Sequence, residues 1–259
     1  MSRTALYILL ALLVFPLSAR ADYVNLTGAE NARNIAEFTV EDDHVRVVLE
    51  IYVQDLAAFV ELLPDEFFEE SEVKPPPLTE RMRRFSEETL QIVTGEGRRL
   101  QAELKLSEPR MRQERFSPFA GLINPYTRQP IPGSPEDKRV LYAELVYPFE
   151  KRPDVLTIIP PRDEAGRPAA SIGFVTFHRG VTVTDFRFLS EMATLRLDWE
   201  DPWYSSFEQK AYKRWQQEGV RAFLYIEPYE VRYEVLARVK DLEAWMDLGL
   251  RGDGYIEED

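Results

Sequence analysis

The stretch "SIGFVTFHRGVTVTDFRFL", residues 171–189, decides the fold class. Two runs rich in β-branched and aromatic residues, 171–178 and 181–189, flank the tripeptide HRG. Glycine adopts a positive φ at little cost, so Gly180 suits the tight turn of a β-hairpin. The stretch therefore predicts two antiparallel strands with His178 as a polar residue at the turn.

Strand patterns continue on both sides of this hairpin. Alternating or β-branched runs predict further strands at 139–149, 154–159, 193–199, 220–227 and 230–239. Short turns between consecutive strands are typical of antiparallel sheets. We therefore expect a mainly β protein, built as an antiparallel β-sandwich of the immunoglobulin-like class.

A strand followed by a helix is predicted near the N-terminus, in "VRVVLEIYVQDLAAFVELLP", residues 45–64. The first half alternates apolar residues with others, as a strand with one buried face does. Asp55 then suits the N-cap of a helix near 55–63. Apolar spacing predicts a second helix over 78–93, which gives two or three accessory α-helices in all.

The segment "VRYEVLARVKDLEAWMDLGL", residues 231–250, resembles residues 45–64 at seven identical positions in twenty. Val231, Tyr233 and Val235 repeat the inward-facing positions of the earlier strand. The similarity indicates either a second module that starts at the C-terminal end or a common local solution that arose twice. The predicted domain organisation has three parts: a signal peptide at 1–21, a β-sandwich domain at 22–220, and a terminal strand–helix unit at 221–259.

The N-terminus has the features of an export signal. Arg3 precedes an apolar run from 5 to 17, and Ala19 and Ala21 form a small-x-small cleavage pattern. The run is short for a membrane span, although an uncleaved anchor is the alternative. Because arginines outnumber lysines 25 to 7, a GC-rich bacterial genome is indicated. We expect a periplasmic or extracellular protein.

Composition excludes several classes of function. The formal net charge of −13 disfavours nucleic acid as a partner, since a duplex is itself densely negative. The chain has no cysteine and only two histidines, His44 and His178, which removes thiolate chemistry and cysteine- or histidine-rich metal sites. No glycine-rich phosphate loop is present. We therefore expect neither a metal nor another cofactor.

Aromatic residues concentrate at 199–233, where ten of 35 residues are aromatic against 12% in the whole chain. Exposed rings beside polar groups can stack on sugars or hold a peptide. The predicted ligand-binding residues are Trp203, Tyr204, Trp215 and Tyr229. The alternative is that the rings fill the open end of the sandwich.

Three functional hypotheses follow. The first is a non-catalytic binding or assembly domain of the bacterial envelope, with an envelope protein, a peptide or a glycan as its partner. The second is the extracytoplasmic portion of a larger membrane protein that continues into the membrane beyond Asp259. The third is a hydrolase that uses carboxylates such as Glu200 and Asp201, which would have to face each other across a cleft.

Overall fold

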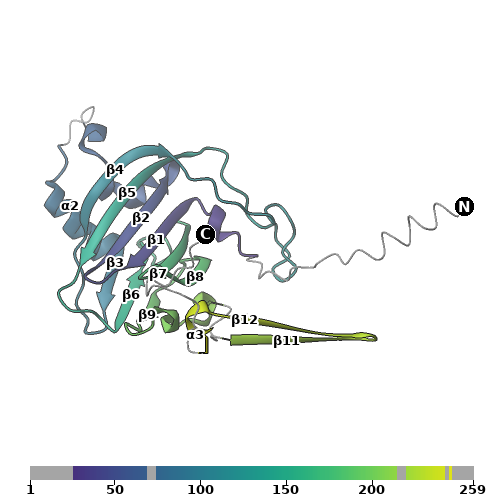
Figure 1. Cartoon of the computed structure of the whole chain (residues 1–259). Coiled ribbons are helices and arrows are strands. Elements are labelled where there is room, and N and C mark those ends of the chain that lie inside the picture. The colour runs from purple at the N-terminus through teal and green to yellow at the C-terminus, as the bar shows by residue number, and fades with distance from the viewer. Residues whose placement is uncertain (1–25, 69–73, 215–219, 243–244, 247–259) are drawn as a thin grey trace, which may run out of the picture.

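The computed structural model describes residues 26–68, 74–214, 220–242 and 245–246 (Figure 1). The predicted signal peptide, 1–21, lies outside the described residues. The chain is mainly β, as the strand patterns predict, and its strands form three separate sheets with mostly antiparallel pairing.

The largest sheet has six strands in the order β4-β5-β2-β1-β7-β8. All neighbours are antiparallel except β1 and β7, which run parallel. The strands are β1 (Asn34–Val40), β2 (His44–Tyr52), β4 (Glu103–Met111), β5 (Arg139–Pro148), β7 (Ile172–His178) and β8 (Val181–Phe188).

The remaining strands form two smaller sheets. A four-stranded sheet has the order β10-β9-β6-β3, and the third sheet is a hairpin of β11 and β12. These strands are β3 (Gln91–Thr94), β6 (Val155–Ile159), β9 (Ala193–Arg196), β10 (Ser206–Phe207), β11 (Val220–Glu227) and β12 (Glu230–Ala237).

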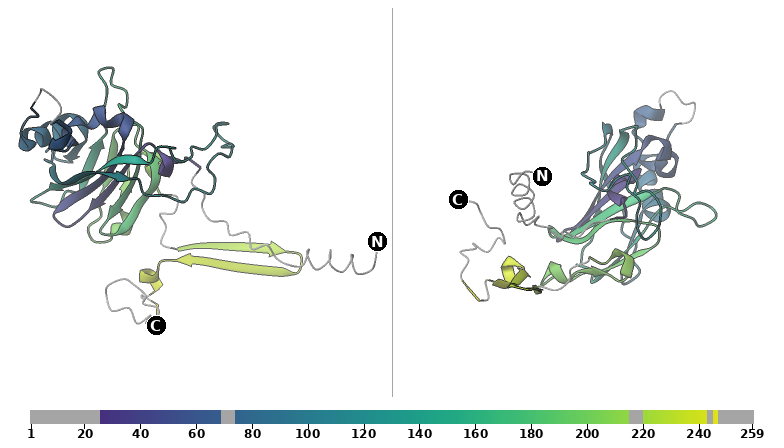
Figure 2. Two further views of the ribbon diagram at one scale, coloured as in Figure 1. Left: turned by 90° about the horizontal axis from the view of Figure 1, so that it is seen from above. Right: turned by 90° about the vertical axis from the view of Figure 1, so that its right-hand side faces the viewer.

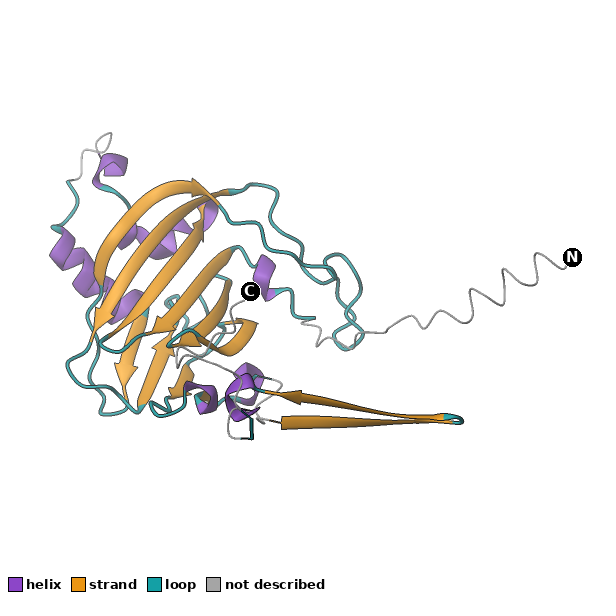
Figure 3. Cartoon of the chain, in the orientation of Figure 1, coloured by secondary structure: helices purple, strands orange, loops and turns teal. Residues whose placement is uncertain are grey.

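Helical segments are short, and most are 3-10 turns (Figure 3). Within the described residues the α-helices are α2 (Leu78–Arg84) and α3 (Val239–Leu242), and α2 continues into a π-helical turn, η4 (Phe85–Thr89). The 3-10 helices are η1 (Ala29–Asn31), η2 (Val53–Leu62), η3 (Asp65–Phe68), η5 (Pro202–Tyr204) and η6 (Lys210–Tyr212).

The predicted helix near 55–63 is the 3-10 helix η2, which is broken by non-helical angles at Phe59. Its N-cap is Tyr52, and no side chain caps it. The prediction that Asp55 is the cap is therefore wrong. Asp55 lies inside the first turn and accepts a hydrogen bond from the Asn34 side chain at 2.7 Å.

The predicted helix over 78–93 ends earlier, at residue 89. Leu90 is extended, and β3 begins at Gln91 and pairs with β6. The physical reason is that Ile92 and Val93 are β-branched, and β-branched side chains suit a pleated surface better than a helix.

One hydrophobic core joins the six-stranded sheet to the four-stranded sheet and to the helical segments. Phe174 of β7 contacts Phe207 of β10 edge to face, with ring centroids 5.7 Å apart. The buried Tyr147 hydroxyl of β5 donates to the Leu90 carbonyl at 2.8 Å, just before β3. The two sheets are thus opposite walls of one core.

The hairpin predicted at 171–189 is present as β7 and β8. Arg179 and Gly180 form its turn with φ of 49° and 80°, the pair of positive values that a type I′ turn requires. The immunoglobulin-like arrangement, by contrast, is not confirmed, since β1 and β7 pair in parallel at the centre of the large sheet. No helix within the described residues is long and apolar enough to cross a membrane.

Gly173 allows the N-terminal segment to lie against β7. A Cβ atom built on Gly173 would stand 1.9 Å from the Ala29 carbonyl oxygen of η1. Such a contact is sterically forbidden, so only glycine permits η1 to pack at this distance. This close approach holds η1 against β7 just before β1 begins at Asn34.

We expect Gly173→Ala to lower the free energy of unfolding by about 2 kcal/mol, since η1 must move away from β7. Chemical denaturation measures this change. Gly133→Ala is the matched control, because its nearest atom outside the neighbouring residues is 4.0 Å from the added Cβ. Equal stability of both variants would contradict the role of Gly173.

Candidate functional site

The most prominent surface feature is the hairpin of β11 and β12, residues 220–237, called the hairpin arm below. Figure 2 shows it extending away from the two packed sheets. Its strands pair in continuous register from Val220 opposite Ala237 to Glu227 opposite Glu230. A two-stranded hairpin is marginally stable on its own in water. The hairpin arm is therefore an element that its own two strands stabilise only weakly.

One face of the hairpin arm is wholly apolar. Residues directly opposite in an antiparallel pair share a face, so the register defines it. All eight side chains of this apolar face lack charge, and all except Ala237 are exposed. The apolar face consists of Val220, Ala222, Leu224, Ile226, Val231, Tyr233, Val235 and Ala237.

The opposite face mixes charged and aromatic residues. Phe223 and Tyr225 stack with ring centroids 6.4 Å apart. The Arg232 guanidinium lies over the Tyr225 ring, 4.4 Å from its centroid. Glu234 is paired with Phe223 across the strands. This face can remain in water at little cost, whereas the apolar face cannot.

Arg238 ties the root of the hairpin arm to the main domain. Its Nη1 lies 3.1 Å from Asp201 Oδ2, and its Nε donates to Asp241 at 2.7 Å. Its guanidinium also lies 5.1 Å from the centroid of the Trp203 ring. Arg214 lies 3.8 Å from the same centroid and donates to the Trp203 carbonyl at 2.6 Å.

The pKa values of the two arginines at this root are shifted in opposite directions. The hydrogen bond to Asp241, together with that to Asp201, raises the pKa of the Arg238 guanidinium although it is largely buried. Burial lowers the pKa of Arg214, which bonds to carbonyls instead. Both stay charged at neutral pH. The Arg238–Asp201 pair is mostly shielded from water, so it binds more strongly than a surface ion pair.

The four predicted ligand-binding residues do not lie together. Trp203 is half-buried between the two arginines at the root of the hairpin arm, and Tyr204 beside it is 55% exposed. Tyr229 is fully exposed at the turn of the arm, at the opposite end. Trp215 falls outside the described residues.

Other rings of the 199–233 stretch belong to the core, as the alternative interpretation expects. Phe207 and Tyr212 are buried against each other, with centroids 5.9 Å apart. Trp199 packs on Phe149 and donates its Nε1–H to the Pro153 carbonyl at 2.8 Å. The stretch thus divides into core rings and rings at the arm and its root.

The two similar segments share local structure but not surroundings. Each is a strand followed by a helical turn, β2 with η2 and β12 with α3. In β2, Val45, Val47 and Leu49 face the core. The expectation that their counterparts in β12 face inward is wrong, because no described part of the protein covers the apolar face of the arm. The alternation itself is the signal that marks this face in the sequence.

Glu200 and Asp201 do not form the pair of available carboxylates that a hydrolase would use. Glu200 is exposed, while Asp201 is occupied by Arg238 and by the backbone N–H of Trp203. No group of three or more histidines, aspartates or glutamates suited to a metal ion occurs among the described residues.

His178 is a core residue, and the expectation of a polar turn residue is wrong. It ends β7 with no exposed surface, and its Nδ1 lies 2.7 Å from Ser205 Oγ. Ser205 Oγ also accepts the backbone N–H of Asp198 at 2.9 Å. Burial, and to a lesser degree Arg179, lowers the pKa of His178 to about 4. The imidazole is therefore uncharged at neutral pH.

Comparison with known proteins assigns no family to this chain. No family model matches it, and neither curated proteins nor solved structures give a significant match.

We expect Arg238→Ala to loosen the root of the hairpin arm by about 2 kcal/mol, the value of a shielded charged hydrogen bond. Hydrogen exchange of the backbone amides of residues 220–237 should become faster, while β1 and β2 keep their protection. Arg196→Ala, which removes an arginine and its ion pair with Glu208 outside the arm, is the control. Unchanged exchange in Arg238→Ala would show that this arginine does not anchor the arm.

His178 predicts a specific pH dependence of stability. Its folded pKa of about 4 lies below the ordinary value of 6.5, so the unfolded chain binds the proton more readily. Its contribution is complete above pH 6.5 and is lost as the pH falls toward 4. The loss is on the order of 3 kcal/mol.

Denaturation of His178→Gln at several pH values tests this expectation. The variant should lose less stability than the unmodified protein between pH 6.5 and 4. His44→Gln, which alters the only other histidine, shows how far any change depends on removing His178 in particular. Parallel pH profiles for the unmodified protein and His178→Gln would contradict the expectation.

Proposed function

We propose that this protein is an exported, non-catalytic assembly domain of the bacterial envelope that associates through the apolar face of its hairpin arm. The observation that carries the proposal is that face, whose eight side chains are all uncharged and almost all exposed. Contiguous exposed apolar surface of this kind marks interaction sites in soluble proteins. Residues 1–21, with the pattern of a signal peptide, support export.

The occupant that these observations favour is the apolar face of a second copy of the chain. The six larger side chains of the face are 47–76% exposed, so the face offers extended apolar surface of the kind that protein interfaces bury. Two-fold pairing would bring this face against itself, so apolar side chains would meet apolar side chains. Because the face has no charge, two acidic chains can meet there without burying a carboxylate.

Tyr229, at the turn that joins the two strands, is fully exposed. A tyrosine contributes a large ring with a polar tip, which is why tyrosines are enriched at interfaces. Tyr229 was predicted as a contact residue from its sequence context, and the proposed dimer keeps it in that role. Trp203 and Tyr204 have a different role here, since they lie at the root where the arm joins the domain.

The proposed dimer is tested by sedimentation of the protein over a range of concentrations. The unmodified protein should associate, and Leu224→Asp should weaken association by roughly thirtyfold or more, because it places a carboxylate in the apolar face. Arg232→Asp introduces the same side chain on the opposite face and should associate normally.

A protein that is monomeric at all concentrations overturns the second copy as the occupant. Equal weakening by both substitutions contradicts the choice of face. Circular dichroism of each variant separates loss of association from loss of the fold.

A further inference from the structure

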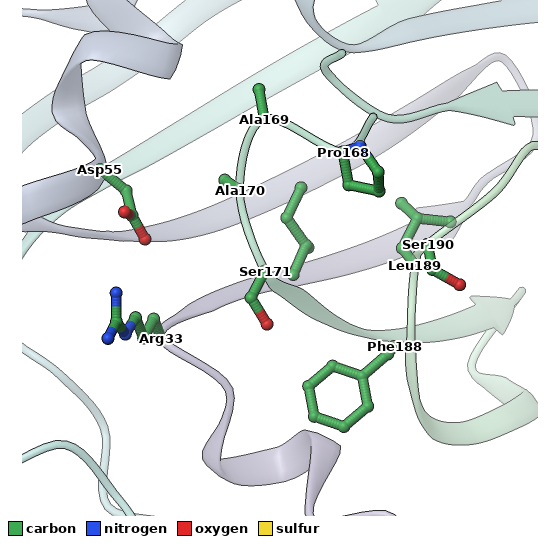
Figure 4. A pocket seen from close by; sticks show the side chains of 10 residues that line it. Arg33, Asp55, Pro168, Ala169, Ala170, Ser171, Phe188, Leu189 and Ser190 are labelled. Carbon is green, nitrogen blue, oxygen red and sulfur yellow. The ribbon is translucent and has the colours of Figure 1, made fainter. Parts of the chain in front are cut away.

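A second site lies at one end of the six-stranded sheet, and none of the residues that line it belongs to the hairpin arm. A hollow of about 600 Å³ opens where β1 and β7 begin and β8 ends (Figure 4). Its volume falls within the range of small-molecule sites, roughly 300–1,000 Å³. Four chain segments form it, and the side chains that matter are Arg33, Asp55, Pro168, Ala169, Phe188 and Ser190.

Asn34 holds this hollow together. Its buried amide donates to Asp55 Oδ2 at 2.7 Å and to the Ser171 carbonyl at 3.0 Å, and it accepts the backbone N–H of Tyr52 at 2.8 Å. The carboxylate of Asp55 is therefore fixed in place before any ligand arrives. Preorganised polar groups of this kind reduce the entropy cost of binding.

Arg33 provides the opposite charge. It immediately precedes β1, and its guanidinium lies 5.9 Å from the centroid of the Tyr52 ring. Within the described part of the chain it has no carboxylate at ion-pair distance, Asp55 included. Figure 4 shows Arg33 and Asp55 on the same side of the hollow, with Ser190 across from them and the Phe188 ring between.

The remaining wall is apolar. Its apolar surface comes from the half-buried Phe188 and the exposed Pro168 and Ala169, whereas Ile172 and Leu189 are buried and offer almost no surface. A ligand that fits must therefore carry both charges at one end and an apolar group at the other. A simple anion would be repelled by Asp55, and a simple cation would be repelled by Arg33.

We infer that this hollow binds a free α-amino acid with an apolar side chain. Its carboxylate pairs with the guanidinium of Arg33, and its ammonium group pairs with the carboxylate of Asp55. The apolar side chain contacts Phe188, Pro168 and Ala169. The ligand has no net charge, so the acidic protein does not repel it. This site is separate from the hairpin arm, and the assembly proposed above does not depend on it.

Calorimetric titration of the protein with the free L-amino acids tests the inference, with leucine as the first probe. Two analogues isolate the charges: leucinamide keeps the ammonium group and lacks the carboxylate, and 4-methylpentanoate keeps only the carboxylate. Each analogue should bind at least about tenfold more weakly than leucine, since each loses one charge-assisted hydrogen-bonded pair.

Two substitutions locate the site. Arg33→Gln removes the anion-binding charge from an exposed side chain, and Asp55→Asn keeps an oxygen that accepts the Asn34 hydrogen bond. Each should weaken leucine binding by about tenfold or more. Arg46→Gln removes an equal charge from a half-exposed position in β2 and should bind leucine normally.

Three results would overturn the inference. The first is that no apolar amino acid binds up to its solubility limit. The second is that leucinamide or 4-methylpentanoate binds as tightly as leucine. The third is that Arg33→Gln and Asp55→Asn both bind like the unmodified protein. Thermal unfolding of each variant confirms that the fold is retained.

Discussion

The buried amide of Asn34 is the contact on which the arrangement of the large sheet depends. It stands at the first position of β1, where β1 pairs in parallel with β7. With its three side-chain hydrogen bonds it joins the start of β1, the end of β2 and the segment before β7. A buried amide left without partners would cost the full desolvation of its polar atoms. The three segments are therefore held in one arrangement, and the hollow beside them is a consequence of it.

A different kind of contact joins the hairpin arm to this core. Apolar packing holds the six-stranded and four-stranded sheets together. The hairpin arm instead contacts the domain through Arg238, Asp201 and the Trp203 ring. Charged hydrogen bonds are directional, so a few residues can set the direction of the arm without burying its strands. This separation leaves the apolar face available. The fold thus offers two surfaces with unrelated chemistry, one apolar and extended, the other concave and doubly charged.

The local elements could largely be predicted from the sequence, because their signals are local. The β7–β8 hairpin follows from two strand runs and a turn with Gly180, and the alternation in 45–51 correctly marks the buried face of β2. The helix over 78–93 was predicted too long, since apolar spacing alone does not distinguish its last residues from a strand. Asp55 was misjudged for a related reason. The rule for N-caps considers only the residues that follow the candidate cap. The hydrogen-bond partner of Asp55 is Asn34, which lies 21 positions earlier.

The candidate sites were less accessible to prediction. Aromatic density pointed to the region of the hairpin arm and its root, but it could not separate Phe207 in the core from Tyr229 on the surface. The residues around the hollow gave no signal, since Arg33, Asp55 and Ser190 are far apart in the chain and ordinary in their neighbourhoods.

The sequence by itself determined that the chain is mainly β, and which side chains along each strand share a face, because the period of two is a property of the extended backbone. Only the tertiary structure decided whether a face is covered. The same alternation is buried in β2 and exposed in β12, since the first faces the hydrophobic core and the second extends beyond it. Long-range contacts decided the rest: Asn34 meets Ser171 across 137 positions, and no local pattern encodes that distance.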